Sequence, residues 1–115
     1  MKADDILKLV SDETGISIED ICLPDYIPGS SKMEVVAARK LAVKLLKVHG
    51  TKVVPEHEKK LTLAEIGEVV GRARYSGHCS VIYCCQSVDD MLATNPKYRR
   101  KFEEIENKLK SLFIK

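Results

Sequence analysis

The sequence predicts an all-α domain of five or six helices around one core. Apolar residues recur at three- and four-residue steps in several segments, capping motifs and glycines separate these segments, and no stretch alternates as a strand would. A chain of 115 residues can close a modest core without a metal or a disulfide. We therefore expect a single helical domain over residues 1–115.

The N-terminal part predicts two short helices. Residues 3–14 form an amphipathic helix that Gly15 ends, because glycine readily takes the left-handed conformation found past a helix C-terminus. Its apolar residues are Ile6, Leu7, Leu9 and Val10. Residues 17–20 restart a turn or a short helix, and the prolines within residues 23–30 predict a loop.

A longer helix is expected from Met33 to Val48. Ser30 and Ser31 precede Glu34 at a spacing that offers a capping box. The expected buried stripe is Val35, Ala38, Leu41, Ala42, Leu45 and Val48. The basic residues largely off this stripe are Arg39, Lys40, Lys44 and Lys47. Residues 49–60 are interpreted as a polar loop.

Two further helices and a final one complete the expected fold. Thr62 and Glu65 form a second capping box, which opens a short helix that Gly71 stops. The next helix starts near Ser76, and its buried stripe is Val81, Cys85, Val88 and Leu92. A turn at residues 95–96 begins an amphipathic helix over about residues 96–114. Its apolar face is Tyr98, Phe102, Ile105, Leu109 and Leu112.

Composition and charge indicate a soluble, cytoplasmic protein. Hydrophobic residues make up 44% of the chain, but none of their runs approaches the roughly 18 residues of a membrane span. The acidic start at Asp4 and Asp5 is unlike a secretion signal. The net charge is only +2, so DNA binding would depend on a locally basic face.

We expect neither a metal site nor a cofactor. The four cysteines form no paired C-x-x-C units, and without a secretion signal they are expected to be reduced thiols. A zinc site would have to combine His49, His57, His78 and Cys79. That spacing matches no established ligand pattern, so small buried thiols are the favoured interpretation.

The segment from about 61 to 92 has the layout of a helix-turn-helix. A short capped helix, a glycine-containing turn and a longer helix follow one another, and in this motif the second helix enters the major groove of DNA. The predicted DNA-binding residues are Arg39, Lys40, Lys47, Arg72, Arg74, Tyr75, Ser76, Gly77, His78, Cys79, Ser80 and Tyr83. Many helical proteins contain a similar helix pair without binding DNA, so spacing alone leaves a purely structural role open.

Three motifs carry a resemblance to a known family. They are Arg39-Lys40-Leu41-Ala42, Leu63-Ala64-Glu65-Ile66-Gly67 and Gly77-His78-Cys79-Ser80-Val81-Ile82-Tyr83. In order and type they resemble the C-terminal DNA-binding domain (domain IV) of the bacterial chromosomal replication initiator DnaA. The similarity extends over most of the chain and is most specific across residues 61–88.

This resemblance implies a Trp-repressor-like helical fold, double-stranded DNA as the ligand, and a role in replication initiation or its regulation. His78 and Ser80 would lie where the family reads bases, and Arg39 and Lys47 would lie on the helix that contacts the DNA backbone. The sequence departs from the family at Gly77, where an aspartate is usual, and at Cys79, where a hydroxyl residue is usual. The turn after Gly71 is also longer.

Two alternatives to DNA binding remain open. The departures at Gly77 and Cys79 motivate a protein-interaction adaptor that keeps the fold without specific DNA reading. An enzyme would need Cys79 activated by His78, but neighbours on a helix point about a third of a turn apart. We expect no enzymatic activity. The chain has no phosphate-binding Gly-x-x-x-x-Gly-Lys motif, so we expect either a fragment of an initiator or, as the favoured interpretation, a stand-alone bacterial or phage relative.

Overall fold

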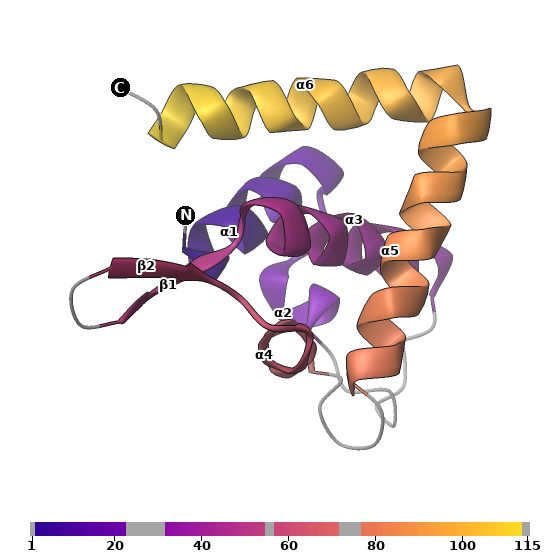
Figure 1. Ribbon diagram of the computed structural model, residues 1–115. Coiled ribbons are helices and arrows are strands. Elements are labelled where there is room, and N and C mark those ends of the chain that lie inside the picture. Colours follow the sequence, from indigo (N-terminus) through magenta and orange to yellow (C-terminus); the bar gives the residue numbers. More distant parts are fainter. Residues whose placement is uncertain (1, 23–31, 55–56, 72–76, 114–115) are drawn as a thin grey trace.

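The structure is a computed structural model that describes residues 2–22, 32–54, 57–71 and 77–113. Within these ranges it contains six helices and one two-stranded sheet (Figure 1), which confirms the all-α class. The elements are α1 (Ala3–Thr14), α2 (Ile18–Ile21), α3 (Met33–His49), β1 (Thr51–Val54), β2 (His57–Lys60), α4 (Leu63–Val69), α5 (Gly77–Thr94) and α6 (Pro96–Phe113).

Helix α1 has the predicted limits, and α2 lies one residue further along the chain than predicted. Gly15 follows α1 with a φ of 75°, and its N–H donates to the Ser11 carbonyl at 2.9 Å. The positive φ is easily reached only by glycine, which explains where α1 ends. The Ser17 hydroxyl then accepts from the Asp20 N–H at 3.2 Å and caps α2. The predicted loop at residues 23–30 lies outside the described residues.

Helix α3 extends over the expected residues, but the exposure of its last turn differs from expectation. Lys32 is its N-cap and makes no side-chain capping bond. The predicted capping box joins Glu34 to Ser30 and Ser31, which lie outside the described residues. The predicted stripe is buried, apart from Val48. Val48 is 39% exposed, because it lies in the last turn, where α3 leaves the core.

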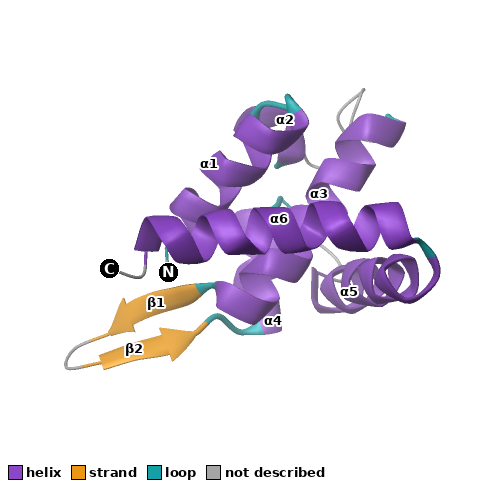
Figure 2. Cartoon of the chain, turned by 90° about the horizontal axis from the view of Figure 1, so that it is seen from above, coloured by secondary structure: helices purple, strands orange, loops and turns teal. Residues whose placement is uncertain are grey.

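The predicted loop at residues 49–60 is wrong: most of this segment is an antiparallel hairpin. Thr51 pairs with Lys60 at its base and Val54 with His57 near its tip. The β-branched residues of β1 favour an extended strand, which the polar composition of the segment concealed. Figures 1 and 2 show the hairpin projecting from the helical body.

Gly50 allows the chain to pass directly from α3 into this hairpin. Its N–H donates to the Leu46 carbonyl at 2.8 Å, and its own carbonyl accepts from the Leu61 N–H at 3.2 Å. A Cβ atom at this position would overlap the Leu46 carbonyl oxygen and lie 2.8 Å from Leu61 Cδ1. A larger residue would therefore force the base of the hairpin away from α3.

The predicted capping box at α4 is confirmed. The Glu65 N–H donates to the Thr62 hydroxyl at 3.2 Å, and the Thr62 N–H donates to the Glu65 carboxylate at 3.0 Å. Gly71 follows the helix with a φ of 74°, as its predicted role at the end of α4 requires. Helix α5 begins at Gly77, one residue from the predicted start.

Helix α6 closes the fold. The Asn95 side-chain oxygen accepts from the N–H groups of Lys97 and Tyr98, both at 3.1 Å, and so caps its first turn. The apolar face of α6 is buried at Phe102, Ile105 and Leu109, as predicted. Seen from above, α6 crosses the other helices, with the hairpin beyond its C-terminal end (Figure 2).

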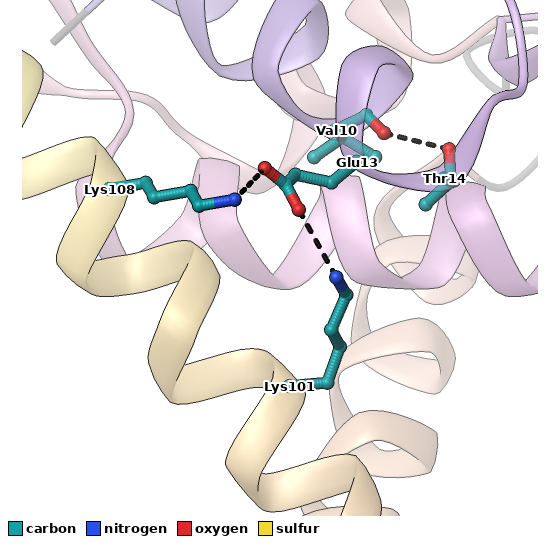
Figure 3. Close-up of polar contacts among 5 residues, drawn as sticks. All are labelled: Val10, Glu13, Thr14, Lys101 and Lys108. Carbon is teal, nitrogen blue, oxygen red and sulfur yellow. Dashed lines mark hydrogen bonds and ion pairs between the residues drawn. The ribbon is translucent and has the colours of Figure 1, made fainter.

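A carboxylate at the end of α1 links the two ends of the chain (Figure 3). Glu13 accepts from Lys101 Nζ at 3.1 Å and from Lys108 Nζ at 2.5 Å, and both lysines belong to α6. These hydrogen bonds from Lys108 and Lys101 lower the pKa of Glu13 below its ordinary value. Thr14 donates to the Val10 carbonyl at 2.7 Å and completes the last turn of α1.

Replacement of Glu13 by Gln should destabilise the fold by about 0.5–1 kcal/mol at pH 7, because two lysines lose their ionic partner. The lowered pKa means that the native state favours the ionised carboxylate. Its contribution is therefore complete above the ordinary value of 4.5 and is lost as the pH falls below it. Urea unfolding at pH 7 and pH 3 would measure this, with exposed Glu103→Gln as control. Equal effects of both changes at pH 7 would contradict the prediction.

Candidate nucleic-acid interface

The buried stripe of α5 determines which side of this helix is exposed. Val81, Cys85 and Val88 are buried against the core, as predicted. Tyr83 and Gln86 consequently point outward, and the Tyr83 side chain is 63% exposed. The side of α5 that the sequence assigned to a ligand is thus open to solvent at these two residues.

Lysines of α3 lie beside this exposed surface. Lys40 Nζ lies 5.1 Å from the centre of the Tyr83 ring and donates to the Ser87 hydroxyl at 3.0 Å. Its charge is therefore held over the aromatic ring, in a cation–π arrangement. One turn later, Lys44 Nζ lies 2.7 Å from a carboxylate oxygen of Asp89. These contacts orient α5 on α3 and keep a positive charge next to Tyr83.

Lys47 is the other lysine of α3 that was predicted to bind DNA. It is exposed, and no residue in the described part of the chain pairs with it. Lys47 therefore presents the freest positive charge on this helix. Lys40, which is partly buried and already hydrogen-bonded, is less available to a ligand.

Arg39 does not lie on the surface, contrary to the expectation that it falls off the buried stripe. It is only 4% exposed, and its Nε donates to the Ile21 carbonyl at 2.8 Å. This bond satisfies a carbonyl at the end of α2 and joins α2 to α3. In this position the guanidinium supports the fold, and it is withdrawn from a phosphate at the surface.

The remaining predicted site residues cannot be placed as side chains. Arg72, Arg74, Tyr75 and Ser76 lie outside the described residues. The first turn of α5 consists of Gly77, His78, Cys79 and Ser80, whose side chains also lie outside the described part. Their predicted roles in DNA binding stay predictions.

Two surface features were missed by the sequence reasoning. The hairpin carries exposed lysines. The β-branched threonine and valines of β1 could have indicated that this segment forms a strand. An open groove of about 510 Å³ also lies between α3, α5 and the start of α6. It is lined by Met33, Val36, Ala37, Lys40, Ser87, Val88, Met91 and Tyr98. No periodicity predicts this groove, because it arises from three helices.

No disulfide joins the described cysteines, which are Cys22, Cys84 and Cys85. Burial raises the pKa of Cys22 and of Cys85, which keeps both protonated at neutral pH. In the described ranges, no three His, Cys, Asp or Glu side chains cluster in a way that could hold a metal ion. None of the described helices is both long and apolar enough to span a membrane.

Comparison with known proteins gives a similarity over nearly the whole chain. No protein-family model matches the sequence. The chain is 28% identical over 106 residues to the chromosomal replication initiator protein DnaA of Picosynechococcus sp.. The matched segment is 92% of this chain but 20% of that protein, so the chain spans about a fifth of the length of the relative.

The position of Arg39 predicts that Arg39→Ala destabilises the fold. It removes a buried hydrogen bond from a charged donor, and we expect a loss of about 2 kcal/mol in the free energy of unfolding. Lys47→Ala, on the exposed side of the same helix, should change it by less than about 0.5 kcal/mol. Urea denaturation followed by circular dichroism measures both. An Arg39→Ala protein as stable as Lys47→Ala would show that the bond to Ile21 contributes little.

Proposed function

We propose that this chain binds double-stranded DNA, with α4 and α5 forming a helix-turn-helix whose second helix enters the major groove. The observation that carries the proposal is the similarity to the replication initiator over 92% of the chain. The resemblance of residues 61–88 to the DNA-binding domain of that family supports the same assignment. Binding would be sequence-specific and connected with replication initiation or its regulation.

The packing of α5 supports this role. Helix α4 packs directly against α5, and α3 packs against both. This packing buries the stripe at Val81, Cys85 and Val88, so the side of α5 that carries Tyr83 stays exposed. An α-helix presented in this way fits the width of the major groove, and the free amides of its first turn attract a phosphate.

Helix α3 would contribute contacts to the DNA backbone. Lys47 is exposed and has no described partner, and Lys40 holds its charge beside Tyr83. Contacts of this kind position a protein on the duplex without reading its sequence. Base reading is assigned to His78 and Ser80, and the departures at Gly77 and Cys79 favour a target that differs from the DnaA box. The proposed function is non-catalytic.

A second candidate is a protein-interaction adaptor with the same fold. The groove between α3, α5 and α6 favours it, because exposed methionines line an otherwise apolar surface. Met33 is 84% exposed and Met91 is 39% exposed. Flexible methionine side chains adapt to varied apolar partners. Partner binding that is insensitive to removal of Arg72 and Arg74 would favour the adaptor.

Titration into fluorescent duplexes tests the proposal. A DnaA-box duplex and a scrambled duplex would be compared at several salt concentrations, because phosphate contacts make the logarithm of the affinity fall linearly with the logarithm of the salt concentration. We expect Lys47→Ala to reduce the slope by about 0.9. A preference of the wild type for the DnaA-box duplex that is lost in Ser80→Ala would show that the family's base reading is kept, and Arg74→Ala should weaken binding to both duplexes. Lys97→Ala, on α6, is the matched control.

The outcomes separate the two candidates. Binding that weakens with salt but is equal for both duplexes would retain DNA binding with a different target sequence. Absence of binding to either duplex at low salt would overturn the DNA-binding proposal. The groove would then be the surface to test, with Met33→Glu introduced to disrupt capture of a protein partner.

A further inference from the structure

The hairpin separates its charges between its two faces. In an antiparallel pair, directly opposite residues share a face and alternate residues along a strand do so too. The pairing of Lys52 with Lys59 and of Val54 with His57 therefore places Lys52, His57 and Lys59 on one face. We call these three residues the basic face of the hairpin.

The other face is different in charge. It carries Thr51, Glu58 and Lys60, since Thr51 pairs with Lys60 and Val53 with Glu58. The Thr51 hydroxyl donates to the Glu58 carboxylate at 3.3 Å, so the acid and a neutral residue occupy much of this face. The described acid of the hairpin is thus kept away from the basic face.

The basic face contains an unfavourable pair, and among the described residues one carboxylate outside the hairpin relieves it. Two lysines directly opposite each other repel, and such pairs destabilise a sheet. Lys52 Nζ lies 2.7 Å from a carboxylate oxygen of Glu65 on α4. Lys59 is exposed, and the described residues provide no anion for it. A positive charge held on a projecting strand without a counter-charge is suited to an anionic ligand.

The same ion pair determines the direction in which the basic face points. Because Lys52 reaches Glu65, this face is turned toward the N-terminal end of α4, the helix that packs against α5. The Lys52 hydrogen bond, with that of the Thr62 backbone, lowers the pKa of Glu65 to about 2. Glu65 is ionised at neutral pH, so its ion pair with Lys52 is present there.

We propose that the basic face of the hairpin binds the phosphate backbone of the same DNA duplex that α5 enters, as a second contact surface beside the helix-turn-helix. This inference rests on the proposed DNA-binding function. The hairpin and α5 lie on either side of α4 (Figure 2), so one duplex along this side meets both. Phosphate is the matching partner because Lys59 and His57 can supply donors, and the described carboxylate at this face, that of Glu65, is already paired with Lys52.

The size of the hairpin limits the contact to a few phosphates. Each strand has four residues, which at about 3.3 Å per residue span roughly 13 Å. This length covers about four base pairs along one DNA strand. The hairpin therefore adds non-specific affinity at the edge of the binding site and carries no base reading of its own.

The test compares two lysines that are neighbours in sequence and lie on opposite faces. Lys59→Ala removes the free charge of the basic face, and Lys60→Ala removes an equal charge from the other face. Both side chains are exposed, so both variants should fold as the wild type does, with equal thermal unfolding by circular dichroism. Affinity for a scrambled duplex of 20 base pairs would be measured from about 50 mM to 300 mM salt.

We expect Lys59→Ala to reduce the slope of the logarithm of the affinity against the logarithm of the salt concentration by about 0.9. This corresponds to roughly eightfold weaker binding at 0.1 M salt relative to a 1 M reference. Lys60→Ala should leave the slope unchanged. Hydroxyl-radical footprinting should show that Lys59→Ala loses protection of a few phosphates at one end of the site, while the centre stays protected.

Three contrary results have different meanings. If the wild type binds DNA and the two variants have equal slopes, the hairpin does not contact phosphate through its basic face, and DNA binding by α4 and α5 stands. If the wild type binds neither duplex at 50 mM salt, both the proposed function and this inference are overturned. If the salt dependence is shallower in Lys60→Ala than in Lys59→Ala, the contact belongs to the opposite face. That result would also overturn the proposal.

Discussion

The packing of α3 against four other helices is the constraint on which the rest of the structure depends. Helices α1, α2, α4 and α5 all contact it, and its residues Ala42, Leu45 and Leu46 are completely buried. A helix covered on so many sides has little surface left for a ligand. In this arrangement Arg39 is buried and bonds α2, and Lys40 and Lys47 are the α3 side chains assigned to the proposed DNA contact.

Most of the helical framework could be predicted from the sequence, because local signals determine it. The limits of α1 follow from Gly15, and the start of α4 follows from Thr62 and Glu65. The outward direction of Tyr83 follows from the spacing of the α5 stripe. In each case residues within two turns of one another carry the information, so no knowledge of the tertiary arrangement is needed.

The features that the sequence did not predict depend instead on contacts with other elements of the fold. Arg39 is buried because the Ile21 carbonyl, eighteen positions earlier, needs a donor. Lys40 is restrained by Ser87, forty-seven positions later. The hairpin was interpreted as a loop because its strands are short and polar, and short hairpins are stabilised by their attachments more than by their own composition. Helical periodicity contains none of these facts.

The attachment of the hairpin also links the two parts of the proposed interface. Glu65 caps α4 through Thr62 and holds Lys52 of β1, so one carboxylate fixes both the start of α4 and the direction of the hairpin. Gly50 fixes the other side of the hairpin base against α3. The hairpin is thereby held at both ends by the helices that support α5. Its lysines are presented in a defined position relative to α5, as a contact surface for a rigid duplex requires.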